Sequence, residues 1–266
     1  MYNLYSMESF CRDNYTNILN SKPYLLYSDG DLVEGINLFS TLLQRNPHDS
    51  NIWVELGFAH LKNLDFDMSL MCFETAYKIN PKNPNVTCAL GLYYYESNKF
   101  KIAKSFYHRT LEIDKNSEWA NLNLSILEQT SGNYFKGLSL YEKRDKKRCL
   151  LLHEGLDESH LREVDDLKRI NKKKKVLIIG EQGFGDQLMI CQYLSRLQTL
   201  GFNITYLIND KLFNLLKNRP ELDRVEIRKE ITANEIKLYK YKIFSMSLPF
   251  LFHKSNIRRE QITLKI

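Results

Sequence analysis

Residues 50–83 read SNIWVELGFAHLKNLDFDMSLMCFETAYKINPKN, and residues 84–117 read PNVTCALGLYYYESNKFKIAKSFYHRTLEIDKNS. The two segments place similar large, small and aromatic residues at the same positions, 34 residues apart. The matched positions are Trp53, Leu56, Gly57, Ser69, Phe73, Ala76 and Pro81 in the first segment, and Thr87, Leu90, Gly91, Ala103, Tyr107, Thr110 and Lys115 in the second. A third copy carries Asn121, Leu124, Ser125, Gly137, Tyr141 and Arg144. One structural unit therefore recurs along the first half of the chain.

Each unit is expected to be a pair of helices. Gly57 lets the second helix approach the first closely, and Phe73 and Ala76 recur at helical spacing on one face of that second helix. A 34-residue period with Leu-Gly, a small residue, an aromatic, Ala and Pro is the signature of tetratricopeptide repeats. We therefore predict an all-α tetratricopeptide superhelix of about three to four repeats over residues 1–148. The predicted helices span 14–28, 31–45, 50–62, 66–79, 84–97, 100–113, 118–130 and 134–147.

The first helix of each pair is expected to line the concave face of this superhelix. By spacing, the residues on that face include Asn51, Phe58, Tyr95, Trp119 and Gln129. An apolar, aromatic groove of this kind can hold a peptide or a partner helix. Several of these side chains could instead pack between repeats, and the sequence leaves both interpretations open.

The composition is that of a globular protein with room for about two domains. Its 266 residues are 43% hydrophobic and 26% charged, with a net charge of +6. Lysine-rich runs such as 143–148 and 172–175 are typical of a solvated linker, with weak attraction to phosphate or a membrane surface as the alternative. We expect no binding to nucleic acid, because no surface motif combines aromatic and basic residues.

The cysteines and the apolar runs restrict the cellular setting. The five cysteines are scattered, without a CxxC pair or zinc spacing, so we expect no metal site and a reduced, cytoplasmic protein. The first residues lack the pattern of a signal peptide. The longest apolar run, residues 244–252, is far shorter than the roughly 18 residues that a membrane span requires.

The periodicity changes after Tyr141. We predict a charged linker over 149–174 and an α/β domain with a Rossmann-like parallel sheet over 175–266. Short runs of β-branched and apolar residues predict strands at 176–179, 204–208, 224–227 and 241–246. Helical spacing predicts helices at 187–200 and 211–217.

A glycine-rich turn, Gly180-Glu181-Gln182-Gly183-Phe184-Gly185-Asp186, follows the first predicted strand and opens a helix. Backbone amides at such a helix start suit an anion. Gly183 and Gly185 would permit positive φ and close approach of a ligand, and Gln182 is a possible polar contact. The spacing matches neither a P-loop nor a dinucleotide-binding fingerprint.

Asp186 is the candidate catalytic residue. It could cap the helix by accepting an amide hydrogen bond. It could also be a general base, because ligands gather at the carboxyl ends of strands in open α/β sheets. The two roles are compatible. Glu181 is interpreted as a charge in the loop rather than a catalyst.

The order of these elements resembles a bacterial family that joins tetratricopeptide arrays to a glycosyltransferase of the ADP-heptose:lipopolysaccharide heptosyltransferase type. The resemblance rests on Tyr141-Glu142-Lys143-Arg144, on the glycine turn, on Pro220-Glu221-Leu222-Asp223-Arg224-Val225 and on Ser245-Met246-Ser247-Leu248-Pro249. It covers most of residues 16–255. It implies a GT-B fold, in which one Rossmann-like half handles the acceptor and the other binds the nucleotide-sugar donor.

The resemblance also implies that Asp186 is the base that activates an acceptor hydroxyl, with Gly183 and Gly185 forming the turn, and that no cofactor is needed. A donor-binding half would require about 150 further residues. We therefore expect a nucleotide-sugar donor to bind only where a second half domain is supplied, which leaves open whether the chain is an enzyme by itself. The alternative is a non-catalytic interaction scaffold with a vestigial α/β domain.

Overall fold

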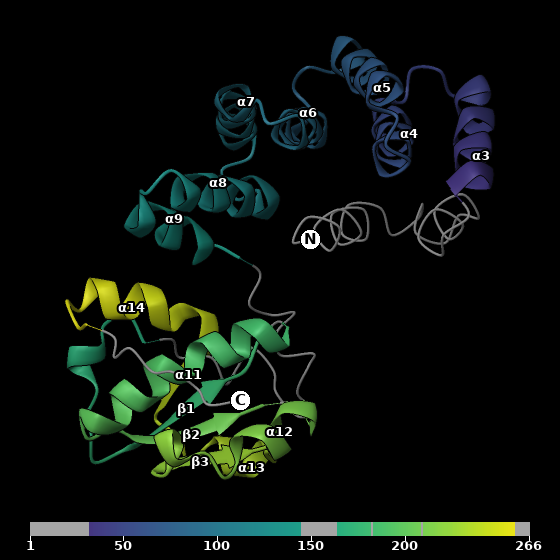
Figure 1. The fold of residues 1–266 in the computed structure, drawn as a ribbon. Helices are drawn as coiled ribbons and strands as arrows, with labels where there is room; N and C mark the ends of the chain where they lie inside the picture. Colours follow the sequence, from purple (N-terminus) through teal and green to yellow (C-terminus); the bar gives the residue numbers. More distant parts are fainter. Residues whose placement is uncertain (1–31, 145–163, 182, 209, 259–266) are drawn as a thin grey trace. The chain divides into compact units, whose positions relative to one another are not determined.

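The computed structural model describes residues 32–144 and 164–258, apart from 182 and 209 (Figure 1). The chain divides into two compact units, Met1–Arg144 and Asp145–Ile266. The first contains helical repeats of the tetratricopeptide type and the second contains a parallel sheet, so the predicted fold class is confirmed. No helix within the described ranges is long and apolar enough to span a membrane.

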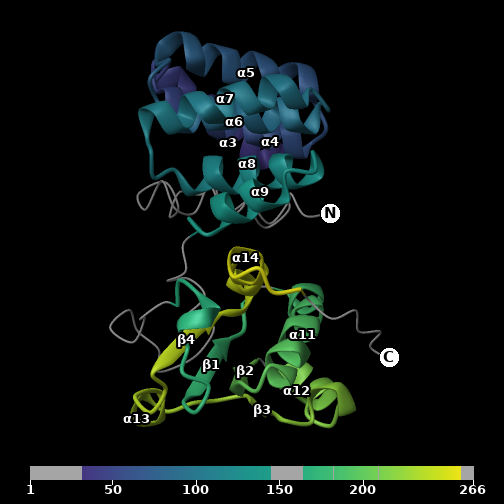
Figure 2. The same cartoon turned by 90° about the vertical axis from the view of Figure 1, so that its left-hand side faces the viewer.

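The first unit is built from successive pairs of antiparallel helices (Figures 1 and 2). Helix α4 packs against α5, α6 against α7, and α8 against α9, while α3 packs against α4. The helices are α3 (Leu32–Arg45), α4 (Ser50–Lys62), α5 (Phe66–Ile79), α6 (Pro84–Glu96), α7 (Phe100–Ile113), α8 (Glu118–Thr130) and α9 (Tyr134–Tyr141). The predicted bounds agree within one residue except at the end of α9, and the helix predicted over 14–28 lies outside the described residues.

Polar caps start the first helix of each pair. The side chains of Asp49, Asn83 and Ser117 accept hydrogen bonds from backbone amides in the first turns of α4, α6 and α8. These amides have no acceptor within the helix, so each capping side chain supplies a hydrogen-bond partner that the amide would otherwise lack. Pro84 lies at the start of α6, where the fixed φ of proline favours a helical conformation.

The helices within a pair approach each other at a glycine. A Cβ placed on Gly57 would lie 2.5 Å from the ring of Phe73, and one on Gly91 would lie 2.5 Å from the ring of Tyr107. Both rings are fully buried. The predicted role of Gly57 in close packing is therefore confirmed, and any larger residue would push the two helices apart.

Two of the differences between the first and second repeats bring a pair of threonines together. Thr87 and Thr110 stand where the first repeat has Trp53 and Ala76. Their hydroxyl oxygens lie 2.9 Å apart and are both buried. Each hydroxyl also has a backbone carbonyl acceptor in its own helix, Pro84 for Thr87 and Phe106 for Thr110, so both buried hydroxyls have partners.

A buried carboxylate joins the helices of the last repeats. The side chain of Glu128 on α8 is fully buried and lies 2.7 Å from the Nζ atoms of both Lys104 on α7 and Lys136 on α9. Asn133 donates a third hydrogen bond to it, at 2.8 Å. Hydrogen bonds from these partners lower the pKa of Glu128 to about 2, so the carboxylate is charged and compensated at neutral pH.

The turns between paired helices recur in a left-handed conformation. Leu64, Asn98 and Gly132 occupy equivalent positions with φ values of 62°, 58° and 84°. Glycine and asparagine tolerate this region, whereas a leucine is strained in it. The side chain of Leu64 is 76% exposed, so packing offers little compensation for the strain.

Substituting Leu64 with glycine should therefore stabilise the first unit by about 1 kcal/mol, because the strain disappears and little buried surface is lost. Thermal or urea unfolding of the full chain measures this difference. Gly132→Ala is the converse control: nothing lies within 4 Å of the added Cβ, yet the positive φ should make it destabilising by a similar amount. A lower melting temperature for Leu64→Gly would contradict the assignment of strain.

The second unit is a four-stranded parallel sheet in the order β3-β2-β1-β4. The strands are β1 (Lys175–Ile179), β2 (Asn203–Leu207), β3 (Val225–Arg228) and β4 (Tyr241–Phe244). The helices are α11 (Phe184–Thr199), α12 (Asp210–Leu216), α13 (Ala233–Ile236) and α14 (Leu248–Lys254), with 3₁₀ turns η2 (Leu167–Arg169), η3 (Pro220–Leu222) and η4 (Ser245–Ser247). The four predicted strands are confirmed, although the last ends at Phe244 because Ser245 begins η4.

The sheet separates two apolar cores (Figure 2). Val176 and Ile178 of β1 face the core formed with α11, α12 and α14, whereas Leu177 and Ile179 face the smaller core under α13. This alternation explains why β1 reads as a continuous apolar run. Leu167 and Ile170, within the segment expected to be a linker, are buried in the larger core.

Candidate functional site

The sheet of the second unit grows in both directions from β1. β1 connects to β2 through α11 on one face, whereas β3 connects to β4 through α13 on the other, and β4 then pairs with the free side of β1. The turns that follow β1 and β4 consequently lie next to each other, with Ile179 paired to Phe244 at the strand ends. In open α/β sheets, ligands bind in the crevice at such a switch point.

Gly180 is required by packing. Its amide donates to the carbonyl of Leu207 at 2.7 Å, and a Cβ at this position would lie 2.6 Å from the same oxygen. The first glycine of the turn thus lets the end of β1 approach β2.

Gly183 and Gly185 differ from Gly180, because a Cβ on either would meet nothing within 4 Å. The expectation of positive φ is wrong for Gly183, which has φ −73° and ψ 170° and is the N-cap of α11, and Gly185 is not among the positive-φ glycines. Both residues are exposed. Neither backbone strain nor packing within the described residues requires a glycine at position 183 or 185. The space beside the two glycines is open and can admit a ligand.

Asp186 lies in the first turn of α11. The interpretation as an N-cap is wrong, because Gly183 holds that position and no side chain caps it. The carboxyl group is half-buried, and burial, followed by the charge of Glu181, raises its pKa above the ordinary value for aspartate. A raised pKa makes a carboxylate a stronger base, which is compatible with the predicted catalytic role.

Glu181 has a larger structural role than the sequence interpretation gave it. It lies in the loop as expected, but it is fully buried. Its backbone N–H donates to Ser245 Oγ at 3.1 Å, and its Oε2 accepts from the backbone N–H of Met246 at 2.8 Å. The residue therefore joins the turn after β1 to the turn after β4. Gln182, the predicted polar contact, lies outside the described residues.

The residues predicted to line the solenoid groove have mixed environments. Phe58 is 1% exposed and packs edge-on against Phe73 with ring centroids 5.1 Å apart, so it belongs to the core and not to an accessible groove. Phe58 lies on the first helix of its pair as predicted, but α4 is largely covered, with Ile52 and residues 54–61 buried.

The other four predicted groove residues are partly exposed. Asn51 Oδ1 accepts from Asn83 Nδ2 at 2.7 Å, and Gln129 Nε2 donates to Ser125 Oγ at 2.9 Å. Trp119 packs against the core of the repeats, as does Tyr95. These side chains combine packing with residual exposure, so Tyr95 and Trp119 are the aromatic candidates for contact with a partner.

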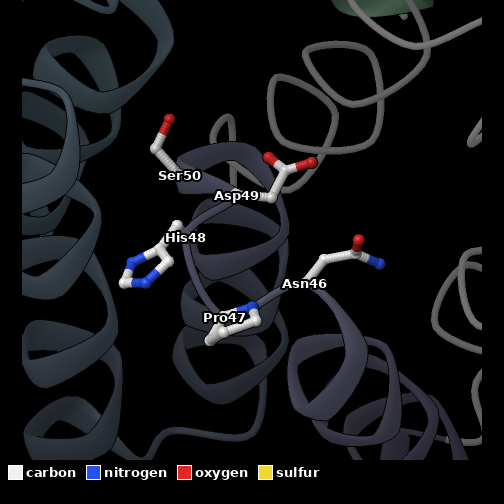
Figure 3. A pocket seen from close by; sticks show the side chains of 5 residues that line it. All are labelled: Asn46, Pro47, His48, Asp49 and Ser50. Carbon is white, nitrogen blue, oxygen red and sulfur yellow. The ribbon is translucent and has the colours of Figure 1, made fainter.

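A shallow hollow of about 480 Å³ lies over the turn between α3 and α4 (Figure 3). It is lined by Asn46, Pro47, His48, Asp49 and Ser50. The side chains point in different directions, and Asp49 already caps α4. No predicted site residue lines it. Across the described part of the chain, no three His, Cys, Asp or Glu residues are grouped as metal ligands.

Comparison with known proteins supports the repeats. No family model matches the chain. A peroxisomal targeting signal receptor from Candida glabrata is 32% identical over 97 residues, which cover 36% of this chain and 16% of the receptor. Anaphase-promoting complex subunit 3 of Schizosaccharomyces pombe is 30% identical over 82 residues, 31% of this chain and 12% of that protein. The matches thus span about one sixth or less of these relatives.

Among solved structures, MamA is 15% identical with a TM-score of 0.39, over 46% of this chain and 72% of MamA. A K341M mutant of the Thermobaculum terrenum O-GlcNAc transferase is 12% identical with a TM-score of 0.44, over 91% of this chain and 42% of the transferase. The chain is a protein with tetratricopeptide-like helical repeats and a small parallel α/β sheet.

Two glycines of the turn should respond differently to alanine. Gly180→Ala should destabilise the second unit by about 1–3 kcal/mol, because its Cβ would overlap a backbone carbonyl. Gly185→Ala should be neutral or stabilising by up to about 1 kcal/mol, because alanine favours the helix and has room. Unfolding in urea compares the two variants. Equal destabilisation by both would contradict the distinction between a packing glycine and an open one.

Proposed function

We propose that the helical repeats bind a protein or peptide and that the second unit is the acceptor-side half of a heptosyltransferase-like glycosyltransferase. The observation that carries the enzymatic part is the position of Asp186, a half-buried carboxylate of raised pKa at the switch point of an open parallel sheet. The open space at Gly183 and Gly185 supports it, because an acceptor can approach the backbone there.

In the proposed reaction, the Asp186 carboxylate takes the proton from an acceptor hydroxyl. The hydroxyl oxygen forms a bond to the anomeric carbon of the sugar as the bond from that carbon to the nucleoside diphosphate breaks, and the diphosphate leaves with the electron pair. Both substrates must be held in near-attack geometry. We assign acceptor binding to the described unit and donor binding to a second Rossmann-like half, which the described residues do not include.

The solenoid part of the proposal rests on its repeats and on the relatives that share them. One relative is by name a receptor for a targeting signal and another is a subunit of a complex. The surface of this chain offers Tyr95 and Trp119 as partly exposed aromatic side chains on successive first helices, α6 and α8. Aromatic anchors of this kind dominate binding energy at interfaces.

Asp186→Asn should reduce transfer by about 10²–10⁴-fold, because the amide cannot accept the proton. The full chain, supplied with a donor-binding Rossmann-like half domain, is assayed for nucleoside diphosphate release from ADP- and UDP-activated sugars in the presence of fractionated cell-envelope saccharides. Asp210→Asn, a change of the same charge at an exposed ion pair with Lys229, is the control and should keep the wild-type rate. Equal rates for Asp186→Asn and wild type would refute the role of the base, and no turnover by wild type would favour the scaffold alternative.

The same variant should change stability in a defined direction. Because the folded state raises the pKa of Asp186, ionisation opposes folding at neutral pH. Asp186→Asn should therefore melt at the same or a higher temperature than wild type at pH 7. The advantage should shrink as the pH falls through the folded-state pKa and vanish below the unfolded value near 3.9.

Peptide binding by the solenoid should depend on the two aromatic residues. Peptides selected on the full chain from a display library should lose about tenfold or more in affinity for Tyr95→Ala and for Trp119→Ala, as measured by fluorescence polarisation. Met71→Ala is the matched control, because Met71 is 43% exposed on α5, a second helix. Unchanged affinity in both aromatic variants, with their fold intact, would place the binding surface elsewhere.

A further inference from the structure

The amino-terminal ends of the four parallel strands lie at one edge of the sheet, opposite the edge that carries the glycine turn. Lys175 of β1 pairs with Asn203 of β2. The registers of β4 on β1 and of β3 on β2, extended by one residue, place Lys240 beside Lys175 and Arg224 beside Asn203. Three of the four positions in this row are therefore cationic.

The turns that lead into the strands add further cations. We call residues 171–175, 200–203, 223–224 and 237–240 together the basic edge. It contains seven exposed cationic side chains and one carboxylate, that of Asp223. The cations are Lys172, Lys173, Lys174, Lys175, Arg224, Lys237 and Lys240.

The opposite edge of the sheet has a different charge pattern. The turns after the strands contain residues of both signs, which are Glu181, Asp186, Asp210, Lys211, Lys229 and Glu230. Positive charge is therefore concentrated on one side of the second unit, although the chain as a whole carries a net charge of only +6.

The lysines of the basic edge belong to an ordered turn and not to a loose linker. The side-chain oxygen of Asn171 accepts from the backbone N–H of Lys173 at 3.0 Å, and its carbonyl oxygen accepts from the backbone N–H of Lys174 at 2.9 Å. The Asn171 N–H donates to the phenol oxygen of Tyr241 at 3.2 Å, which ties the turn to β4. The fold thus holds this lysine run at a fixed place on the sheet.

Most of these charges are left for an external partner. Lys175 pairs with Glu226, with 3.2 Å between Nζ and Oε2. Of the carboxylates that flank the edge, Asp165 pairs with Arg169, and Glu221 is half-buried. Among the described residues, no ion pair engages the other cations of the basic edge. An excess of positive charge of this kind attracts an anionic surface.

An exposed leucine stands among the cations. Leu238, in the turn 237–240, is 76% exposed. Its N–H donates to the carbonyl of Glu235 at 3.0 Å, and the buried Tyr239 beside it donates its hydroxyl to Thr205 Oγ1 at 3.0 Å. A single exposed leucine is ordinary by itself. Here, however, an ordered turn holds it outward within a cationic surface.

Cations around an apolar side chain match the surface of an anionic bilayer. Lysine and arginine meet the phosphate headgroups, while the apolar side chain enters the boundary of the acyl chains. Nucleic acid fits less well, because proteins hold single strands by stacking bases on exposed aromatic side chains. The aromatic residues of the basic edge, Phe202 and Tyr239, are both buried.

We propose that the basic edge binds anionic lipid headgroups at a membrane surface, with Leu238 entering the lipid. The strands run from this edge toward the glycine turn, so binding leaves that turn accessible. The proposal is independent of the proposed transfer reaction, because it uses the opposite edge of the sheet and needs no catalytic residue.

Flotation of the full chain with vesicles tests the charge. It should bind vesicles of phosphatidylglycerol and phosphatidylcholine but not phosphatidylcholine alone, and high salt should weaken binding. The double variant Lys173→Glu/Lys174→Glu should lose about tenfold or more in affinity, because each cation near an anionic surface contributes about fivefold. Lys82→Glu/Lys115→Glu makes the same charge change at exposed positions of the first unit and should bind like wild type.

Leu238→Ser tests the apolar contact, and it keeps the proposal open to refutation should the charge variant not fold. The affinity for the anionic vesicles should fall by about threefold or more, because the apolar contribution is lost. Leu64→Ser is the matched control: Leu64 is also 76% exposed but lies in the first unit, so its affinity should be unchanged. Circular dichroism checks that each variant is folded.

Three results would overturn the proposal. The first is a wild-type chain that does not bind the anionic vesicles. The second is an equal loss in the two double variants, since net charge and not the basic edge would then govern binding. The third is a folded Leu238→Ser that binds the vesicles like wild type while the wild-type chain binds single-stranded DNA more tightly than lipid, which would assign the edge to nucleic acid.

Discussion

The contact between a glycine and an aromatic ring is the constraint on which the repeats depend. Gly57 under Phe73 and Gly91 under Tyr107 set how closely the helices of a pair can lie, since a single added carbon would come within 2.5 Å of either ring. The close approach buries the ring and leaves an apolar face that only the next pair can cover. This contact sets the spacing of the helices in the first two of these pairs.

The second unit obeys a different constraint, which is that a parallel sheet needs cover on both faces. Because the crossover connections share one handedness, helices cover both faces only when strands are added on both sides of a central strand. That requirement places the turns after β1 and β4 side by side, with Glu181 between them. The adjacency of the two turns is thus a consequence of topology, and the residues in them decide what chemistry they can support.

The sequence predicts the periodic features well and the individual environments poorly. Helix bounds in the repeats follow from spacing and caps, and the strands follow from short apolar runs, because both patterns reflect burial averaged over many residues. Phe58 fails as a groove residue because its environment depends on what covers α4, which spacing alone does not specify. Asp186 as a cap fails because α11 begins at Phe184 and its N-cap is Gly183. Glu181 gives no periodic signal at all, and only its partners, 64 and 65 positions away, identify it as buried.

Two of the buried glutamates in the described residues, Glu128 and Glu181, differ in their surroundings. Glu128 contacts two ammonium groups, and hydrogen bonds from them lower its pKa. These contacts compensate its charge and join three helices. Glu181 accepts a hydrogen bond from the backbone N–H of Met246, and its own backbone N–H donates to the hydroxyl of Ser245. The charge of Glu128 is therefore compensated by cations, whereas the charge of Glu181 is, after burial, the second cause of the raised pKa of Asp186.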